Sequence, residues 1–317
     1  MNGAAPTIEI FKPFGDAFEL TKKILFRPFD LQKWCVIGFA AFLAGNFAGG
    51  SGFSWPGRLN SSQRHQPMYN PMAGVHLEWW GIVLIVALAV AIMAIVLILV
   101  WLSARGRFIF TDCIVRNRAA IVIPWHEYRK EGNGYFLFTL AVGFGAALIF
   151  GLVALLIFVP VGLLGHASNG GSTMLLPVLF VLCFIIWVCF AFFFGLVSYF
   201  MVPIMYIRRV GPVEAFRVVT RLLLNNIGSF VLFCLFSLVL FLAVIVIGGI
   251  VSCLTCCIAA LPYVGSVILL PLFVCLRAFG LLFLRQFGPE YDVWAGVVPP
   301  ETPATPLPPP IPPPIQS

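Results

Sequence analysis

The sequence predicts an all-α, polytopic membrane protein with six transmembrane helices arranged as three hairpins. Each hairpin is expected to follow an amphipathic helix at the cytoplasmic face. Three observations predict this fold: long stretches without charge, basic residues confined to alternate connections, and a repeated amphipathic segment. Of the 317 residues, 61% are hydrophobic and 10% are charged, whereas globular domains carry about 25% charged residues. Hydrocarbon is therefore the expected solvent for most of the chain.

The charge-free stretches give the number of spans. Four blocks without Asp, Glu, Lys or Arg hold 181 residues, and they are Trp34–Gly57, Trp79–Ala104, Gly132–Ile207 and Leu222–Leu276. A spanning helix needs about 20 apolar residues, so the two short blocks hold one span each and the two long blocks hold two. The spans are predicted at Gln32–Phe47, Trp79–Leu102, Tyr135–Val159, Leu175–Ile207, Ile227–Val251 and Tyr263–Phe287.

The basic residues predict the orientation of this threading. Seventeen Lys and Arg lie on the side of the two termini, and Arg58 and Arg64 lie on the other side. The positive-inside rule then places both termini in the cytoplasm, with the protein in the cell (inner) membrane. Residues 1–33 become a cytoplasmic segment, residues 34–287 the membrane domain, and residues 288–317 a Pro-rich cytoplasmic tail expected to be disordered. No cleavable signal peptide is expected, because charges run through residues 1–33.

An amphipathic segment precedes each pair of spans, at Pro13–Phe26, Pro124–Glu131 and Pro212–Leu224. The middle one is expected to break at Gly132–Gly134. Such helices lie in the lipid headgroup layer, where they either anchor loops or bind anionic headgroups. The basic residues available for binding lipid or phosphate are Lys22, Lys23, Arg105, Arg107, Arg116, Arg118, Arg208, Arg209, Arg217 and Arg221.

The stretch Arg105–Glu131 is the densest polar region of the chain. Asp112 and Arg116 stand four residues apart, as a helix that continues out of the second span would place them. Arginine offers a bidentate fork to phosphate oxygens, so this region either holds a phosphate or forms a mutually paired polar face. Arg277 interrupts the sixth span and is predicted to form an intramembrane ion pair with Asp112 or with Glu127.

Two further features carry open alternatives. Cys253, Cys256 and Cys257 lie at the turn before the sixth span, where they either form a disulfide or serve as small apolar residues. The tail at 299–317 is rich in proline and either docks to a protein partner or acts as an extended tether. The four histidines show no paired spacing, so neither a metal site nor a cofactor is expected. No nucleic-acid-binding module is present in the sequence.

Several stretches resemble an uncharacterised family of bacterial six-helix membrane proteins. They are Arg27–Asp30 with Lys33 and Trp34, Arg107–Ile121, Pro124–Asn133, Cys253–Gly265 and Leu284–Asp292. The layout is also similar, more distantly, to the membrane domain fused to some glycerophosphodiester phosphodiesterases. The resemblance covers about residues 8 to 294 and implies no catalytic residues and no phosphodiesterase chemistry.

The functional prediction is a non-enzymatic membrane component that engages lipids, anionic ones among them, or partner proteins through its basic face. A transporter or channel for a small solute is the first alternative, and it requires a polar cavity between spans. The second alternative is a lipid-modifying enzyme, for which Asp112, His126 and Glu127 are the available acid–base residues.

Overall fold

The computed structural model describes residues 9–45, 79–165, 175–255 and 262–295, which are helical with short connections and contain no strand. The first three helices are α1 (Phe11–Leu25), α2 (Leu31–Leu43) and α3 (Trp79–Val115). The middle of the chain forms α4 (Val122–Glu127), α5 (Arg129–Gly165), α6 (Leu175–Arg208) and α7 (Pro212–Asn225). The last helices are α8 (Ile227–Leu254), α9 (Pro262–Ile268) and α10 (Leu270–Arg285), before a short 3-10 turn at Pro289–Tyr291.

Four of these helices are long and apolar enough to cross a membrane, namely α3, α5, α6 and α8. None of the most apolar 18-residue window of α3, α5 or α6 is buried inside the protein, and only 17% of that window is buried in α8. Apolar side chains exposed on this scale require a hydrocarbon environment, because soluble proteins rarely expose large contiguous apolar surface. The length and composition of these four helices agree with the predicted second, third, fourth and fifth spans.

The predictions of a first and a sixth span are wrong. Helix α2 has 13 residues, which is about 20 Å of helix and too short for a hydrocarbon core of about 30 Å. The predicted sixth span is divided at Leu269 into α9 and α10, and α10 has 16 residues. Both helices are apolar because they pack inside protein, where Ile37, Ala41, Phe279 and Leu284 are buried.

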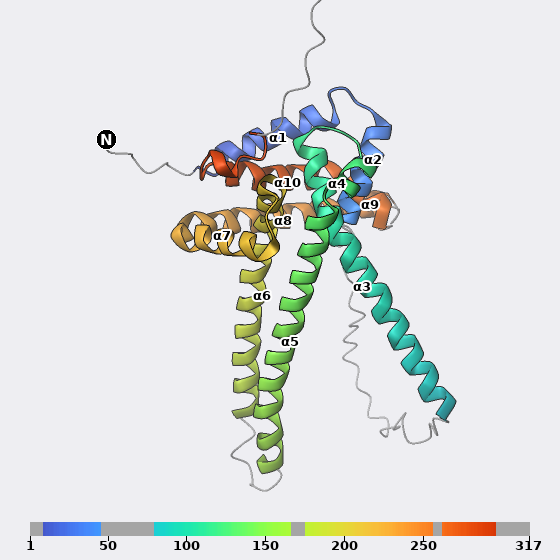
Figure 1. The fold of residues 1–317 in the computed structure, drawn as a ribbon, viewed down its shortest axis with the longest axis vertical. Coiled ribbons are helices and arrows are strands. Elements are labelled where there is room, and N and C mark those ends of the chain that lie inside the picture. The colour runs from blue at the N-terminus through green and yellow to red at the C-terminus, as the bar shows by residue number, and fades with distance from the viewer. Residues whose placement is uncertain (1–8, 46–78, 166–174, 256–261, 296–317) are drawn as a thin grey trace, which may run out of the picture.

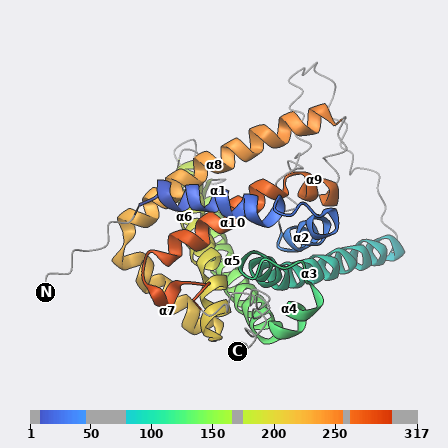
Figure 2. The ribbon, with the colours of Figure 1, turned by 90° about the horizontal axis from the view of Figure 1, so that it is seen from above.

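The buried helices form a head from which the long helices extend. We use the name head for α1, α2, α4, α7, α9 and α10 together with the ends of α3, α5 and α6 that meet them. Helices α5 and α6 run side by side away from the head, α3 leaves it at an angle, and α8 runs across it (Figures 1 and 2).

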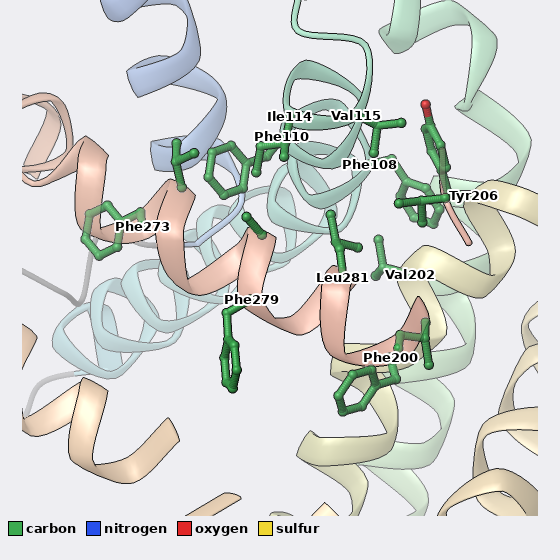
Figure 3. Packing of buried hydrophobic residues seen from close by; sticks show 14 of the residues in the cluster. Phe108, Phe110, Ile114, Val115, Phe200, Val202, Tyr206, Phe273, Phe279 and Leu281 are labelled. Carbon is green, nitrogen blue, oxygen red and sulfur yellow. The ribbon is translucent and has the colours of Figure 1, made fainter. Parts of the chain in front are cut away.

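Helix α10 lies at the centre of the head (Figure 3). Its Phe273, Phe279 and Leu281 pack in a buried cluster with Phe108 of α3 and Phe200 of α6. The backbone of α10 approaches α6 so closely that a Cβ at Gly280 would overlap the hydroxyl of Tyr199. Close approach of this kind is possible only at residues without a side chain.

The amphipathic segments form helices whose apolar faces pack largely on protein. Ala17 and Ile24 of α1 are fully buried, and the ring of Phe14 lies 6.2 Å from that of Phe279 on α10. On α7, which begins with Pro212 at a position that suits proline, Ala215 and Val219 are buried. The predicted break at Gly132–Gly134 is wrong, because α5 runs through it and the chain turns at Tyr128 instead.

Candidate functional site

The polar residues of the head gather first around Asp112, whose side chain is fully buried. Because α3 continues to Val115, Arg116 lies one turn after Asp112, and its Nε is 3.2 Å from Oδ1 of Asp112. Nη2 of Arg118 lies 2.8 Å from the other carboxylate oxygen, and the hydroxyl of Tyr206 donates to Oδ1 at 3.0 Å. A buried carboxylate is stable only with such partners, because an unpaired buried charge is costly.

Glu127 joins the same cluster from the end of α4. Its Oε1 accepts from Arg209 at 2.6 Å and from Arg116 at 3.2 Å, and Arg209 also lies 3.4 Å from Glu131. Arg209 has a positive φ of 53°, and its guanidinium lies over the ring of Tyr128, 4.0 Å from the ring centre. Three arginines thus meet three carboxylates, and the cluster carries no net charge.

The electrostatics favour this pairing. Burial lowers the pKa of Arg116, but a hydrogen bond with Tyr206 and the charge of Asp112 outweigh it and raise the pKa above its ordinary value. Arg116 therefore stays charged at every physiological pH. Around Asp112 and Glu127 the contacts form the mutually paired face, and this cluster has no uncompensated charge to offer a phosphate.

Two further residues that were predicted to bind lipid or phosphate, Arg105 and Arg208, are engaged by other side chains of the protein. Arg105 is 6% exposed and donates to Oδ1 of Asn133 at 2.8 and 3.0 Å. Its guanidinium lies 4.4 Å from the ring centre of Trp101 and 4.7 Å from that of Trp125. Arg208 is 2.8 Å from Glu290. Arg105 therefore joins α3 to α5, and Arg208 joins α6 to the segment after α10.

The prediction that Arg277 pairs with Asp112 or Glu127 is wrong. Nη2 and Nε of Arg277 donate to the hydroxyl of Thr111 at 3.0 and 3.3 Å, and Nη1 donates to the carbonyl of Tyr199 at 3.3 Å. Thr111 and Asp112 are neighbours on α3, but successive residues of a helix point about 100° apart. Helix α10 packs on the Thr111 side, so Arg277 never reaches the carboxylate.

The remaining predicted cations have no carboxylate within 4.0 Å in the part of the chain that the structure describes. They are Lys22 and Lys23 on α1, Arg107 on α3, and Arg217 and Arg221 on α7. Lys22 Nζ lies 5.0 Å from the ring centre of Phe18. These residues keep their charge available for an external anion.

Beside Lys22 lies an apolar groove of about 680 Å³, which we call the α1–α8–α10 groove. Its walls are apolar side chains, among them Phe18 of α1, Phe26 directly after α1, and Val244 of α8. Lys22 and Arg27 are its charged lining residues, and its lining includes no Asp or Glu. Arg27 was not predicted as a site residue, although it is a basic residue at the end of an amphipathic helix.

The predicted cysteine cluster and the Pro-rich tail lie partly or wholly outside the residues that the structure describes. Cys253 is exposed near the end of α8, whereas Cys256, Cys257 and the Pro-rich tail lie outside the described residues. Within the described ranges, no group of three or more His, Cys, Asp or Glu side chains could hold a metal ion. The disulfide and the tail's partner therefore stay predictions.

Comparison with known proteins identifies one relationship. The model of a family of unknown function, DUF7544, matches residues 9–294, which agrees with the extent of the resemblance seen in the sequence. No curated protein and no solved structure matches the chain. No link to the membrane domain of the glycerophosphodiester phosphodiesterases is found.

Proposed function

The chain belongs to DUF7544, a family of unknown function, and from the geometry of its head we propose that it is a non-enzymatic membrane protein that binds an anionic phospholipid. In this proposal an acyl chain lies in the α1–α8–α10 groove and the phosphate group reaches Lys22 and Arg27. One observation carries the proposal. The groove joins a helix that is long and apolar enough to span a membrane, an amphipathic helix and two cations, and its lining includes no carboxylate.

The cations, and not the apolar walls, give this site its selectivity. Lipid tails are as apolar as the side chains of α8, so moving an acyl chain from the bilayer into the groove gains little free energy. Attraction of an anionic lipid to a basic residue near the membrane surface contributes about 1 kcal/mol. Lys22 and Arg27 together therefore favour an anionic lipid over a neutral one by about 2 kcal/mol.

The state of the acidic residues supports a binding role over catalysis. Asp112 contacts two arginines and a tyrosine, and Glu127 contacts three arginines. A general base needs a free oxygen within hydrogen-bond reach of the proton that it takes. The carboxylate oxygens of Asp112 and Glu127 are instead engaged by fixed cations of the protein.

The proposal is tested on the full-length protein in nanodiscs of phosphatidylcholine with a minor share of phosphatidylglycerol. Native mass spectrometry counts the phosphatidylglycerol that the protein retains. The substitutions K22Q and R27Q should each lower the preference for this lipid about fivefold, which corresponds to about 1 kcal/mol. K12Q is the matched control on α1, because Lys12 does not line the groove.

A second variant separates the groove from general surface charge. Ala243 lines the groove from an exposed position on α8, so A243W fills the groove without changing any charge. Loss of retained phosphatidylglycerol in A243W supports the groove as the binding site. Retention equal to that of the unmodified protein in A243W, K22Q and R27Q would overturn the proposal.

A further inference from the structure

A second cavity, of about 270 Å³, lies where α3, α6 and α10 meet the end of α2. Two arginines line it, Arg107 from α3 and Arg277 from α10. Ser198 and Tyr199 of α6 line it as well. The cavity is separate from the α1–α8–α10 groove, because the two share no lining residue.

Both arginines of the cavity are held by neutral groups alone. Arg277 donates to the hydroxyl of Thr111 and to the carbonyl of Tyr199, and its guanidinium stacks over the Tyr199 ring at 4.9 Å. Arg107 donates to the hydroxyl of Tyr135 at 2.6 Å. Among the described residues, no carboxylate lies within 4.0 Å of either guanidinium. Two positive charges thus face one cavity without compensation.

The hydroxyl of Ser198 is a second, independent observation that indicates a ligand in this cavity. Ser198 is 5% exposed, and its Oγ has no hydrogen-bond partner in the described part of the chain. A buried hydroxyl without a partner costs free energy, so its position in the wall of this cavity calls for an acceptor. An anion in the cavity would accept from Ser198 and from both arginines.

We infer that this cavity binds a phosphate-type oxyanion, held by Arg107, Arg277 and Ser198. Guanidinium groups match phosphate oxygens with two parallel hydrogen bonds, and each arginine has five N–H donors, of which the contacts above use only some. One water occupies about 30 Å³ of liquid, so the volume accommodates a phosphate group with several waters. The anion comes either from free inorganic phosphate or from a lipid headgroup.

The experiment measures the thermal unfolding of the full-length protein in phosphatidylcholine nanodiscs against the concentration of inorganic phosphate. The midpoint should rise with phosphate, because a ligand of the folded state stabilises it. R107Q and R277Q should each weaken the apparent affinity roughly tenfold or more, since hydrogen bonds to charged groups are the strong ones. R285Q is the matched control on α10, because Arg285 pairs with Asp292 away from the cavity.

S198A keeps the test valid if the arginine variants do not fold. Removing a buried hydroxyl that has no partner should not lower the ligand-free midpoint and should raise it by the penalty that the hydroxyl carries, whereas the affinity for phosphate should fall about fivefold to tenfold. A structural role alone would not produce this combination. Phosphate affinity that is unchanged in S198A and in R277Q would overturn a free-phosphate site.

A second arm distinguishes the two sources of the anion. If inorganic phosphate has no effect, the same variants are compared in nanodiscs with and without phosphatidylglycerol. A stabilisation by this lipid that S198A reduces assigns the cavity to a headgroup. No response in either arm overturns the inference. In the inorganic-phosphate arm K22Q should respond like the unmodified protein, and in the lipid arm the effect of S198A should add to that of K22Q, so failure of the groove proposal is distinguishable from failure of this one.

Discussion

The two arginine clusters of the head lie on two faces of the same helix and have opposite electrostatic states. Around Asp112, Arg116 and Arg118 are compensated by carboxylates at 2.8 to 3.2 Å. Around Thr111, one residue earlier, the polar and aromatic contacts of Arg277 within the described ranges are a hydroxyl, a carbonyl and an aromatic ring. The difference shows that the function of an arginine is set by the element that packs against it. The paired cluster links elements of the fold, whereas the unpaired one is the cluster for which we propose an anionic ligand.

Breaking the paired cluster should have the largest effect on stability. D112N leaves Arg116 and Arg118 without their shared buried carboxylate, and losing one partner of a buried pair costs about 3 to 5 kcal/mol. The arginine side chains are 35% and 28% exposed, so water offsets part of the cost and we expect about 3 kcal/mol. The measurement is the free energy of unfolding in detergent by denaturant titration.

The control for this prediction is E290Q, which breaks the pair of Arg208 with a glutamate side chain that is 61% exposed. An exposed pair contributes about 0 to 1 kcal/mol, so E290Q should lie well below D112N. Equal losses in the two variants would mean that the buried cluster has no special role in the fold.

The unpaired cations of α7 should have an intermediate effect, on lipid and not on folding. R217E combined with R221E reverses two charges that have no carboxylate within 4.0 Å in the described residues. At about 1 kcal/mol per basic residue, the double variant should lose at least about 2 kcal/mol of attraction to anionic lipid. Mass spectrometry of the lipid that copurifies with the protein measures the loss.

R208Q sharpens this comparison, because Arg208 is already held by Glu290. Its removal should change the retained anionic lipid far less than the double reversal on α7. An unchanged lipid content in the double variant would contradict a lipid-binding role for α7.

The smallest expected effect concerns Tyr128, which stacks under Arg209 in the paired cluster. Burial raises the pKa of Tyr128 above its ordinary value of 10.0, and the charge of Arg209 opposes this only in part. The folded protein therefore holds the phenolic proton more tightly than the unfolded chain. The resulting stability is complete below pH 10 and is lost as the pH rises above it.

Thermal unfolding at pH 8 and at pH 10.5 tests this prediction in the unmodified protein and in Y128F. The ring under Arg209 is kept in the variant, but the titrating hydroxyl is removed. The unmodified protein should lose more stability between the two pH values than Y128F does. Parallel losses would show that Tyr128 has no part in the alkaline response.

The sequence was sufficient to predict the helices that are long and apolar enough to span a membrane, but not the apolar helices that pack within protein. In α3, α5, α6 and α8 the charge-free stretches exceed any protein interior of this size, so their class follows from composition. Helices α2 and α10 have a similar composition because a protein core and a bilayer select the same side chains. The features that distinguish these two helices from membrane spans are the short length of α2 and the division at Leu269 before α10.

The candidate sites were predictable to a similar degree. The spacing of Asp112 and Arg116 predicted their contact, since residues four apart meet on a helix. The partner of Arg277 depends on whether Thr111 or Asp112 faces α10. These two residues are adjacent, and sequence patterns place the end of a helix only to within several residues, so they do not predict which of the two faces α10. Ser198 lies inside a charge-free stretch of 76 residues, and nothing in the sequence marks it.

The packing of α1 on α10 also constrains how the protein is made. The backbone N–H of Glu9 donates to the side chain of Gln286, across 277 residues of sequence. At about 5 to 20 residues per second, a ribosome needs about 14 to 55 s to synthesise that interval. Throughout this time the apolar side of α1 has no α10 to cover it. A nascent α1 must therefore rest on the bilayer surface or on a chaperone until the last helix emerges from the ribosome.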